Sequence, residues 1–200
     1  IEHHAKDTIN AGAGLCDPNA VNSIVEAGPA AIERLVSLGV EFDRQDTSSY
    51  DLTREGGHSR RRILHTKDVT GREIDRALRR RVQETSNIEV LPHHIVIDLI
   101  TQTPSQPGPR QCIGAYILNS ETGEVDTIAA KATLLATGGA GKAYLYTSNP
   151  DVSTGDGVAM AYRAGATIAN MEFFQFHPTC LFHSKAKSFL ISEALRGEGA

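Results

Sequence analysis

The sequence predicts an α/β fold into which an antiparallel meander is inserted. Three observations support this prediction. Helix signals surround a periodic apolar segment near the beginning of the chain. Two runs rich in Ile, Val and Leu follow, and a hairpin pattern comes after them. A short, mainly apolar segment then precedes a helix of small residues, which is the alternation typical of α/β domains.

The first predicted helix begins at Asp17-Pro18-Asn19, because Asp is a common N-cap and Pro fits the first helical position. Gly39 is the expected C-terminal stop. We expect Pro29 to kink or split this helix, since proline has no backbone N–H to donate. The apolar positions at helical spacing are Val21, Ile24, Val25, Ile32, Leu35, Val36 and Leu38.

A polar segment over residues 45–67 is predicted to be an ordered loop. Thr70 and Glu73 after it match a T-x-x-E capping box, and they predict a helix that runs to about Thr85. Gly155–Gly165 predicts a third helix, built from small residues.

Five segments are predicted to be strands from their content of Ile, Val and Leu. Ile88–Leu91 and His94–Thr101 come first. Cys112–Leu118 and Glu124–Ala130, joined by a turn that ends in Gly123, form the hairpin. Ala132–Ala136 is mainly apolar, as expected for a strand buried on both faces.

Composition excludes several classes of protein. The net charge of −4 argues against a nucleic-acid binder, and the short run Arg60–Arg62 fits a solvated loop. No apolar run approaches the roughly 18–20 residues that cross a bilayer. Cys16, Cys112 and Cys180 lie far apart, which fits a reducing compartment. The histidines lack metal-ligand spacing, so we expect no metal. From the net charge and the lack of a long apolar run, we expect no nucleic-acid or membrane partner.

Two glycine-containing turns could approach a cofactor, and both also have a purely structural interpretation. A-T-G-G at Ala136–Gly139 lies beyond the predicted buried strand, where ligands of α/β sheets bind, or it is a tight turn. Asp156 in Thr154–Gly157 could grip ligand hydroxyls or cap its helix. Gly12-Ala13-Gly14 lacks the strand that a dinucleotide fingerprint needs, so we interpret it as a loop.

Polar side chains suited to an anionic substrate follow near the end of the chain. His177 sits among Phe173, Phe174 and Phe176 just before a proline, and it could donate to an anion or be a buried structural histidine. Ser192 and Glu193 add a hydroxyl and a carboxylate. Glu193 could instead form an ordinary i,i+3 pair with Arg196.

Five motifs in order are more specific than any one of them. They are G-G-H-S-x-x-R-x-x-x-x-x-D-x-T-G at Gly56–Gly71, A-T-G-G, S-T-G-D-G, F-Q-F-H-P-T and S-E-A-L-R-G-E-G-A. Through them the chain resembles the flavoprotein family of succinate dehydrogenase, fumarate reductase and L-aspartate oxidase. The resemblance implies FAD as cofactor and, over residues 1–175, part of a Rossmann-like FAD-binding domain of the glutathione-reductase type. It implies that an α+β capping domain starts over residues 176–200.

Glu55 distinguishes between the substrates of this family. L-T-R-E-G-G-H-S at Leu52–Ser59 is most similar to the aspartate-oxidising branch, whereas the succinate and fumarate enzymes usually have an uncharged residue before the glycine pair. L-aspartate has an α-ammonium group that succinate lacks, and a buried cation needs a carboxylate partner. Breaking such a buried pair costs about 3–5 kcal/mol.

The resemblance implies a role for each matching position. His177 would hold one substrate carboxylate, with the Ser192 hydroxyl donating beside it. Glu193 would belong to the proton path, and Glu55 would meet the substrate ammonium. The expected FAD contacts are Ile95 and Val96 along the adenine, together with Ala136, Thr137, Gly138 and Asp156.

We therefore expect the parent protein to oxidise L-aspartate to iminoaspartate in the cytoplasm, with oxygen or fumarate as electron acceptor. Quinolinate synthase would then use the iminoaspartate in NAD biosynthesis. The chain begins without methionine and ends at R-G-E-G-A, so we expect an internal fragment that lacks the glycine fingerprint and an active-site arginine and is inactive alone. Two alternatives remain open: a soluble fumarate reductase or succinate dehydrogenase flavoprotein subunit, and a non-catalytic FAD-binding protein.

Overall fold

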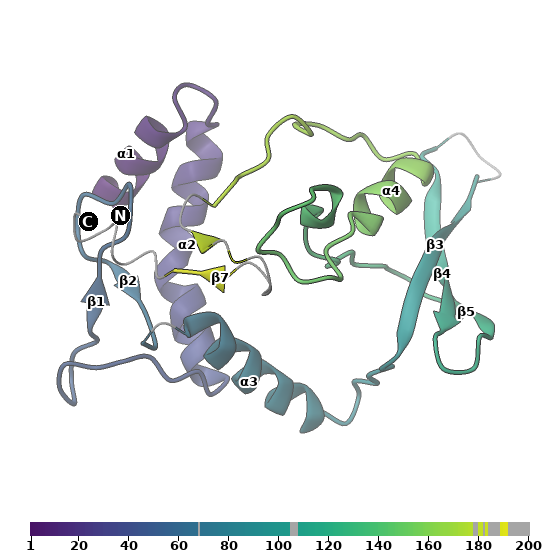
Figure 1. The fold of residues 1–200 in the computed structure, drawn as a ribbon, viewed down its shortest axis with the longest axis horizontal. Helices are drawn as coiled ribbons and strands as arrows, with labels where there is room; N and C mark the ends of the chain where they lie inside the picture. Colours follow the sequence, from purple (N-terminus) through teal and green to yellow (C-terminus); the bar gives the residue numbers. More distant parts are fainter. Residues whose placement is uncertain (68, 105–107, 178–179, 182, 184–188, 192–200) are drawn as a thin grey trace. The chain divides into compact units, whose positions relative to one another are not determined.

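The computed structural model describes residues 1–67, 69–104, 108–177, 180–181, 183 and 189–191. The chain forms two compact units, of which the first contains residues 1–89 and the second the described residues between 90 and 191 (Figure 1).

The first unit is mainly helical. Its elements are α1 (Glu2–Ala11), α2 (Pro18–Ser37), the short antiparallel pair β1 (Leu52–Thr53) and β2 (Ile63–Leu64), and α3 (Thr70–Gln83). The predicted loop over residues 45–67 is therefore interrupted by two short strands. No capping side chain begins α1, which explains why the sequence did not predict this helix.

The predicted first helix is confirmed as α2. The Asp17 carboxylate accepts a hydrogen bond from the backbone N–H of Asn19 at 2.8 Å, as an N-cap does. The expected split at Pro29 is wrong, because α2 continues through this residue. Val21 and Val25 of α2 are buried with Ala5 of α1. Such packing of an apolar face, rather than local propensity, supplies most of the stability of a helix.

A second core cluster joins α2 to α3. Val40, Phe42 and Ala77 are buried in it, and Ala77 lies on α3. The helix α3 is confirmed, but the predicted capping box is wrong. The N-cap position is Val69, and the Glu73 carboxylate instead accepts from the backbone N–H of Glu41 at 2.9 Å. The Glu73 carboxylate thus accepts from a donor far away in the sequence and not from a backbone N–H at the start of its own helix.

The second unit contains the predicted meander. Its three antiparallel strands are β3 (His94–Gln102), β4 (Gln111–Asn119) and β5 (Val125–Ala129), in that order across the sheet. The expected small-residue helix is α4 (Asp156–Arg163), whose Met160 is the most deeply buried large side chain. The remaining elements are the 3-10 helix η1 (Gly141–Ala143), β6 (Cys180–Leu181) and β7 (Phe189–Leu190).

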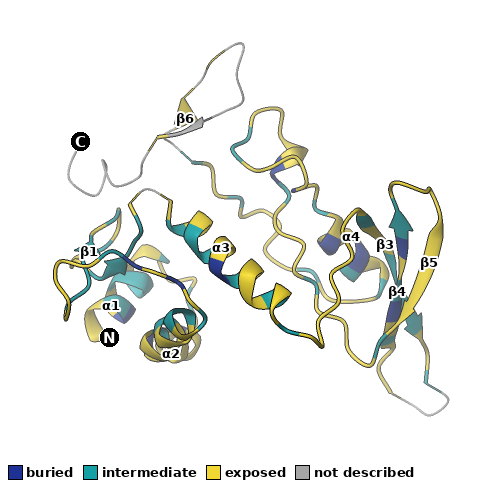
Figure 2. Cartoon of the chain, turned by 90° about the horizontal axis from the view of Figure 1, so that it is seen from below, coloured by how far each residue is buried: buried dark blue, intermediate teal, exposed yellow. Residues whose placement is uncertain are grey.

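Two predicted strands are absent from the described chain. Ile88–Leu91 and Ala132–Ala136 adopt no strand structure, and Leu134 is 90% exposed. Strands buried on both faces are typical of parallel sheets, whereas every strand pair among the described residues is antiparallel. Figure 2 shows how little of the second unit is buried outside β4 and α4. Within the part described, no helix is long and apolar enough to cross a membrane.

Candidate functional site

Glu55 lies in the loop that connects β1 to β2. The backbone N–H of His58 donates to the Glu55 carbonyl at 3.1 Å, which closes a turn over Gly56 and Gly57. The Glu55 side chain is half-buried. Among the residues that the structure describes, its carboxylate has no hydrogen-bond or ion-pair partner. A carboxylate in this state can accept a cation from outside the chain.

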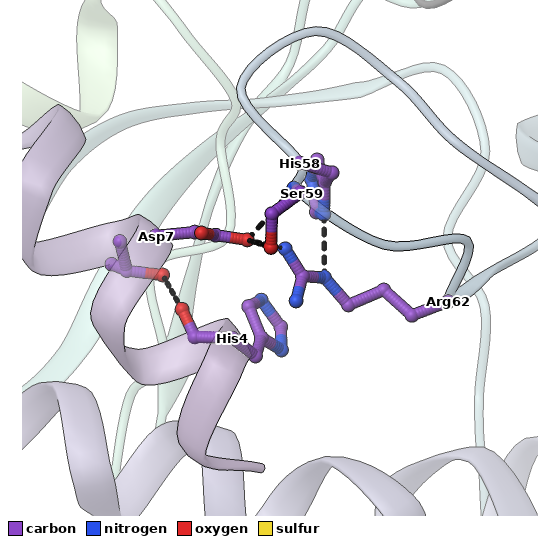
Figure 3. Close-up of polar contacts among 6 residues, drawn as sticks. His4, Asp7, His58, Ser59 and Arg62 are labelled. Carbon is purple, nitrogen blue, oxygen red and sulfur yellow. Dashed lines mark hydrogen bonds and ion pairs between the residues drawn. The ribbon is translucent and has the colours of Figure 1, made fainter.

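The return arm of this loop is attached to α1 through Asp7 (Figure 3). One carboxylate oxygen, Oδ2, accepts from the backbone N–H of Ser59 at 2.9 Å and from the Ser59 hydroxyl at 2.8 Å. It also accepts from Nη2 of Arg62. Nε of Arg62 donates to Nδ1 of His58 at 2.7 Å, so the guanidinium joins Asp7 to the residue that closes the turn.

In this cluster the negative charge of Asp7 is paired with the positive charge of Arg62. The Asp7 and Arg62 side chains are only 17% and 16% exposed, so solvent screens their pair weakly. The Ser59 backbone N–H and then Arg62 hold the pKa of the Asp7 carboxyl far below its usual range. Burial, followed by the Arg62 cation, lowers the pKa of His4, whose ring lies 5.8 Å from that of His58 between centroids. Asp7 is therefore a fixed anion throughout the physiological range.

In the second unit, the structure brings together the two glycine-containing turns that the sequence singled out. The Gly155 N–H donates to the Gly139 carbonyl at 3.2 Å. A Cβ at Gly157 would come within 1.9 Å of the Thr137 Oγ1, so α4 begins directly against the A-T-G-G turn. Asp156 does not cap its helix. Its carboxylate instead accepts from the Thr154 hydroxyl at 2.7 Å.

The arrangement fits a cofactor that approaches the backbone. Ala136, Thr137, Gly138 and Asp156 are exposed on this face. Gly138 has φ +74°, a conformation that favours glycine, and no atom lies within 4 Å of the position its Cβ would take. Exposed backbone suits the phosphates of a dinucleotide, and a carboxylate can accept hydrogen bonds from its hydroxyls.

The edge strand β3 is connected to this region through α4. Nε of Arg163 donates to the Asp98 carboxylate at 2.7 Å, which ties the end of α4 to β3. Ile95 and Val96, the expected adenine contacts, lie earlier on β3 and are 51% and 36% exposed. Their backbone pairs with Leu118 and Ile117 of β4.

His177 is half-buried beside a cavity of about 210 Å³. Phe174 and Phe176 line it together with residues 146–149. Tyr144 contacts both phenylalanine rings, with centroids 4.6 and 5.0 Å apart. The three phenylalanines near His177 exclude water only in part, because Phe173 is 61% and Phe176 63% exposed.

The predicted site residues are distributed over both units. Glu55 belongs to the first, and the predicted FAD contacts and His177 belong to the second. Ser192 and Glu193 lie outside the described residues. Asp7 had no sequence signal, because its partners are 52 and 55 positions away. Among the described residues, no group of three or more His, Cys, Asp or Glu could hold a metal ion.

The chain is similar to known FAD-binding proteins, and several of these relatives are L-aspartate oxidases. The whole chain, residues 1–200, matches the family described as the FAD binding domain. It is 52% identical over 207 residues to an L-aspartate oxidase of Pseudomonas aeruginosa, covering 100% of the chain and 38% of that protein. It is 56% identical over 201 residues to L-aspartate oxidase 1 of Ralstonia nicotianae, covering 99% and 38%. The chloroplastic L-aspartate oxidase of Arabidopsis thaliana is 48% identical, with 100% and 32% covered.

Solved structures agree with these relatives. The E. coli quinol fumarate reductase FrdA chain, in a mutant form, superposes with a TM-score of 0.89 at 31% identity, covering 99% of this chain and 32% of that one. Mycobacterium smegmatis Sdh1 gives a TM-score of 0.84 at 33% identity, with 98% and 34% covered. The chain thus spans well under half the length of these relatives.

Proposed function

Because this chain belongs to the FAD-binding domain family of the succinate dehydrogenase and fumarate reductase flavoproteins, we propose that its parent protein is an FAD-dependent enzyme that oxidises L-aspartate to iminoaspartate. L-aspartate oxidases at about 50% identity cover the whole chain, whereas the fumarate reductase and succinate dehydrogenase structures are 31–33% identical.

One observation favours the amino acid over the plain dicarboxylate. Glu55 is a half-buried carboxylate that has no partner among the described residues. A partly desolvated anion gains from a cationic ligand, and the α-ammonium of L-aspartate is such a ligand. Succinate and fumarate offer no positive charge at this position, so they would leave Glu55 uncompensated.

The other proposed contacts orient the substrate and the cofactor. Exposed Thr137, Gly138 and Asp156 would hold FAD, with Ile95 and Val96 along its adenine. FAD, when bound, supplies the electron-accepting chemistry. His177 would donate to one substrate carboxylate at the rim of its cavity, and Ser192 and Glu193 would complete that end.

We also propose oxygen or fumarate as the electron acceptor and quinolinate synthase as the enzyme that consumes iminoaspartate. A cytoplasmic location is supported by Cys16, Cys112 and Cys180, all of which are free thiols.

The test is a comparison of substrates with the purified full-length parent protein. L-aspartate should bleach the flavin spectrum anaerobically and should be turned over, while succinate should not. Turnover of succinate but not of L-aspartate would identify a fumarate reductase or succinate dehydrogenase flavoprotein instead. A flavin spectrum that no dicarboxylate bleaches would indicate a non-catalytic FAD-binding protein.

A further inference from the structure

We propose that Asp7 is a positioning residue for the Glu55 loop, and that it thereby sets the preference for an amino-dicarboxylate over a plain dicarboxylate. This inference rests on the proposed function, because it requires that Glu55 meets the substrate ammonium. Asp7 lies on α1, more than fifty residues from the loop it holds.

The loop needs an external attachment. Glu55 is followed by Gly56 and Gly57, and Gly57 has φ +83°. Two successive glycines leave the backbone with high conformational freedom, so the turn cannot hold Glu55 in place by itself. At its base the loop is closed by the Arg62 N–H, which donates to the Thr53 carbonyl at 3.1 Å.

Asp7 provides that attachment at a single atom. Its Oδ2 receives the Ser59 N–H, the Ser59 hydroxyl and Nη2 of Arg62. Arg62 in turn donates to His58, whose N–H closes the turn on the Glu55 carbonyl. Hydrogen bonds therefore link each pair of neighbouring residues on the path from Asp7 to Glu55, and the covalent frame of His58 connects its ring to its backbone N–H (Figure 3 shows the Asp7 half of the path).

The geometry also fixes the tautomer of His58. Because Nδ1 accepts from Arg62, it carries no proton, and the ring proton of the neutral imidazole lies on Nε2. Within the turn, Glu55 is the charged group that has no partner among the described residues.

The experiment uses the full-length flavoprotein with Asp7→Asn, which keeps the size of the side chain and removes its charge. The matched control is Asp46→Asn. The Asp46 carboxylate likewise accepts from a serine hydroxyl and from backbone N–H groups, of Ser48 and Ser49, but all within its own turn. Ser59→Ala is a milder second variant, because it deletes one hydrogen bond and keeps the Arg62 pair.

We expect kcat/KM for L-aspartate to fall about tenfold in Asp7→Asn, since a slightly misplaced binding group can cost up to about 100-fold. The inhibition constant of succinate, which has no ammonium group, should change by less than about twofold. Ser59→Ala should lose less in the same direction, and Asp46→Asn should resemble the wild type.

Two further readouts separate positioning from general stability. Added to Glu55→Gln, Asp7→Asn should cause almost no further loss, because residues that act through one group are not additive. Trypsin should cut faster after the exposed residues Arg60 and Arg61 in Asp7→Asn than in Asp46→Asn, because local opening exposes the loop.

An additive loss in the double variant, or an equal loss of L-aspartate and succinate binding, would overturn the inference while the proposed function stands. Equal tryptic cleavage of Asp7→Asn and Asp46→Asn would also overturn it. A wild-type protein that does not oxidise L-aspartate would overturn the proposed function, and this inference with it.

Discussion

Glu55→Gln tests whether a single carboxylate selects the substrate. Glutamine keeps the length and polarity of the side chain but removes the negative charge. The substitution should leave the loop intact, because among the described residues Glu55 takes part in the turn through its backbone carbonyl, which accepts from the His58 N–H. Any change in kinetics then results from the loss of the negative charge.

The size of the effect follows from the environment of Glu55. A fully buried ion pair that loses one partner costs about 3–5 kcal/mol. Glu55 is half-buried, so solvent reduces this penalty. A hydrogen bond to a charged group contributes about 1.5–3 kcal/mol, and about 1.4 kcal/mol is a factor of ten. We therefore expect kcat/KM for L-aspartate to fall about 10- to 150-fold.

The assay measures initial rates with L-aspartate and the inhibition constant of succinate on the same flavin-loaded preparation. Glu33→Gln is the matched control, because Glu33 is an exposed glutamate on α2 and has no partner among the described residues. Unchanged L-aspartate kinetics in Glu55→Gln would refute the role of this residue. A loss of succinate binding as large as the loss of L-aspartate binding would refute the argument from charge.

Three further predictions concern the rest of the chain. Gly157→Ala should weaken FAD binding in a fluorescence titration and destabilise the fold by about 1–3 kcal/mol, because its Cβ would overlap Thr137; unchanged affinity would contradict this. Arg163→Ala should lower stability by less than about 1 kcal/mol, since its pair with Asp98 is half-exposed; a much larger loss of thermal stability would contradict it. Arg76 and the Glu41 N–H lower the pKa of Glu73 to about 2, so its contribution to stability is present above the ordinary value of 4.5 and disappears as the pH falls towards 2. The urea midpoint of Glu73→Gln should therefore approach that of the wild type as the pH falls through this window, and a constant difference would contradict the assignment.

The control for Gly157→Ala is Gly71→Ala near the start of α3. A Cβ at Gly71 would meet no atom within 4 Å, and its φ is not in the left-handed region. Alanine also has the higher helix propensity. Gly71→Ala should therefore keep or raise stability and leave FAD binding unchanged.

Elements with local signals were predictable from the sequence. Asp17 caps α2 because its partner lies two residues away, and the β4–β5 hairpin follows from a turn that ends at Gly123. The two turns of the predicted FAD site were also recognisable, because glycine at Gly138 and Gly155 indicates backbone conformations that other residues avoid.

The errors arose where long-range partners decide the structure. Ala132–Ala136 has the composition of a buried strand, but a strand forms only where another strand pairs with it. Thr70 and Glu73 match a capping box, yet the Glu41 N–H competes successfully for the Glu73 carboxylate. The anchor at Asp7 was invisible for the same reason, since no local pattern connects it to Ser59 and Arg62.

The attachment of Asp7 to Arg62 also has a consequence for the order of folding. It closes a segment of 55 residues, and loop closure of that length costs about 3.5 kcal/mol of chain entropy by the logarithmic scaling. The contacts between α1 and α2 span far fewer residues, so they form at lower entropic cost. The loop that carries Glu55 should therefore be among the last parts of the first unit to become ordered and among the first to open. In a partly destabilised protein, discrimination between substrates would be lost while the helical core remains folded.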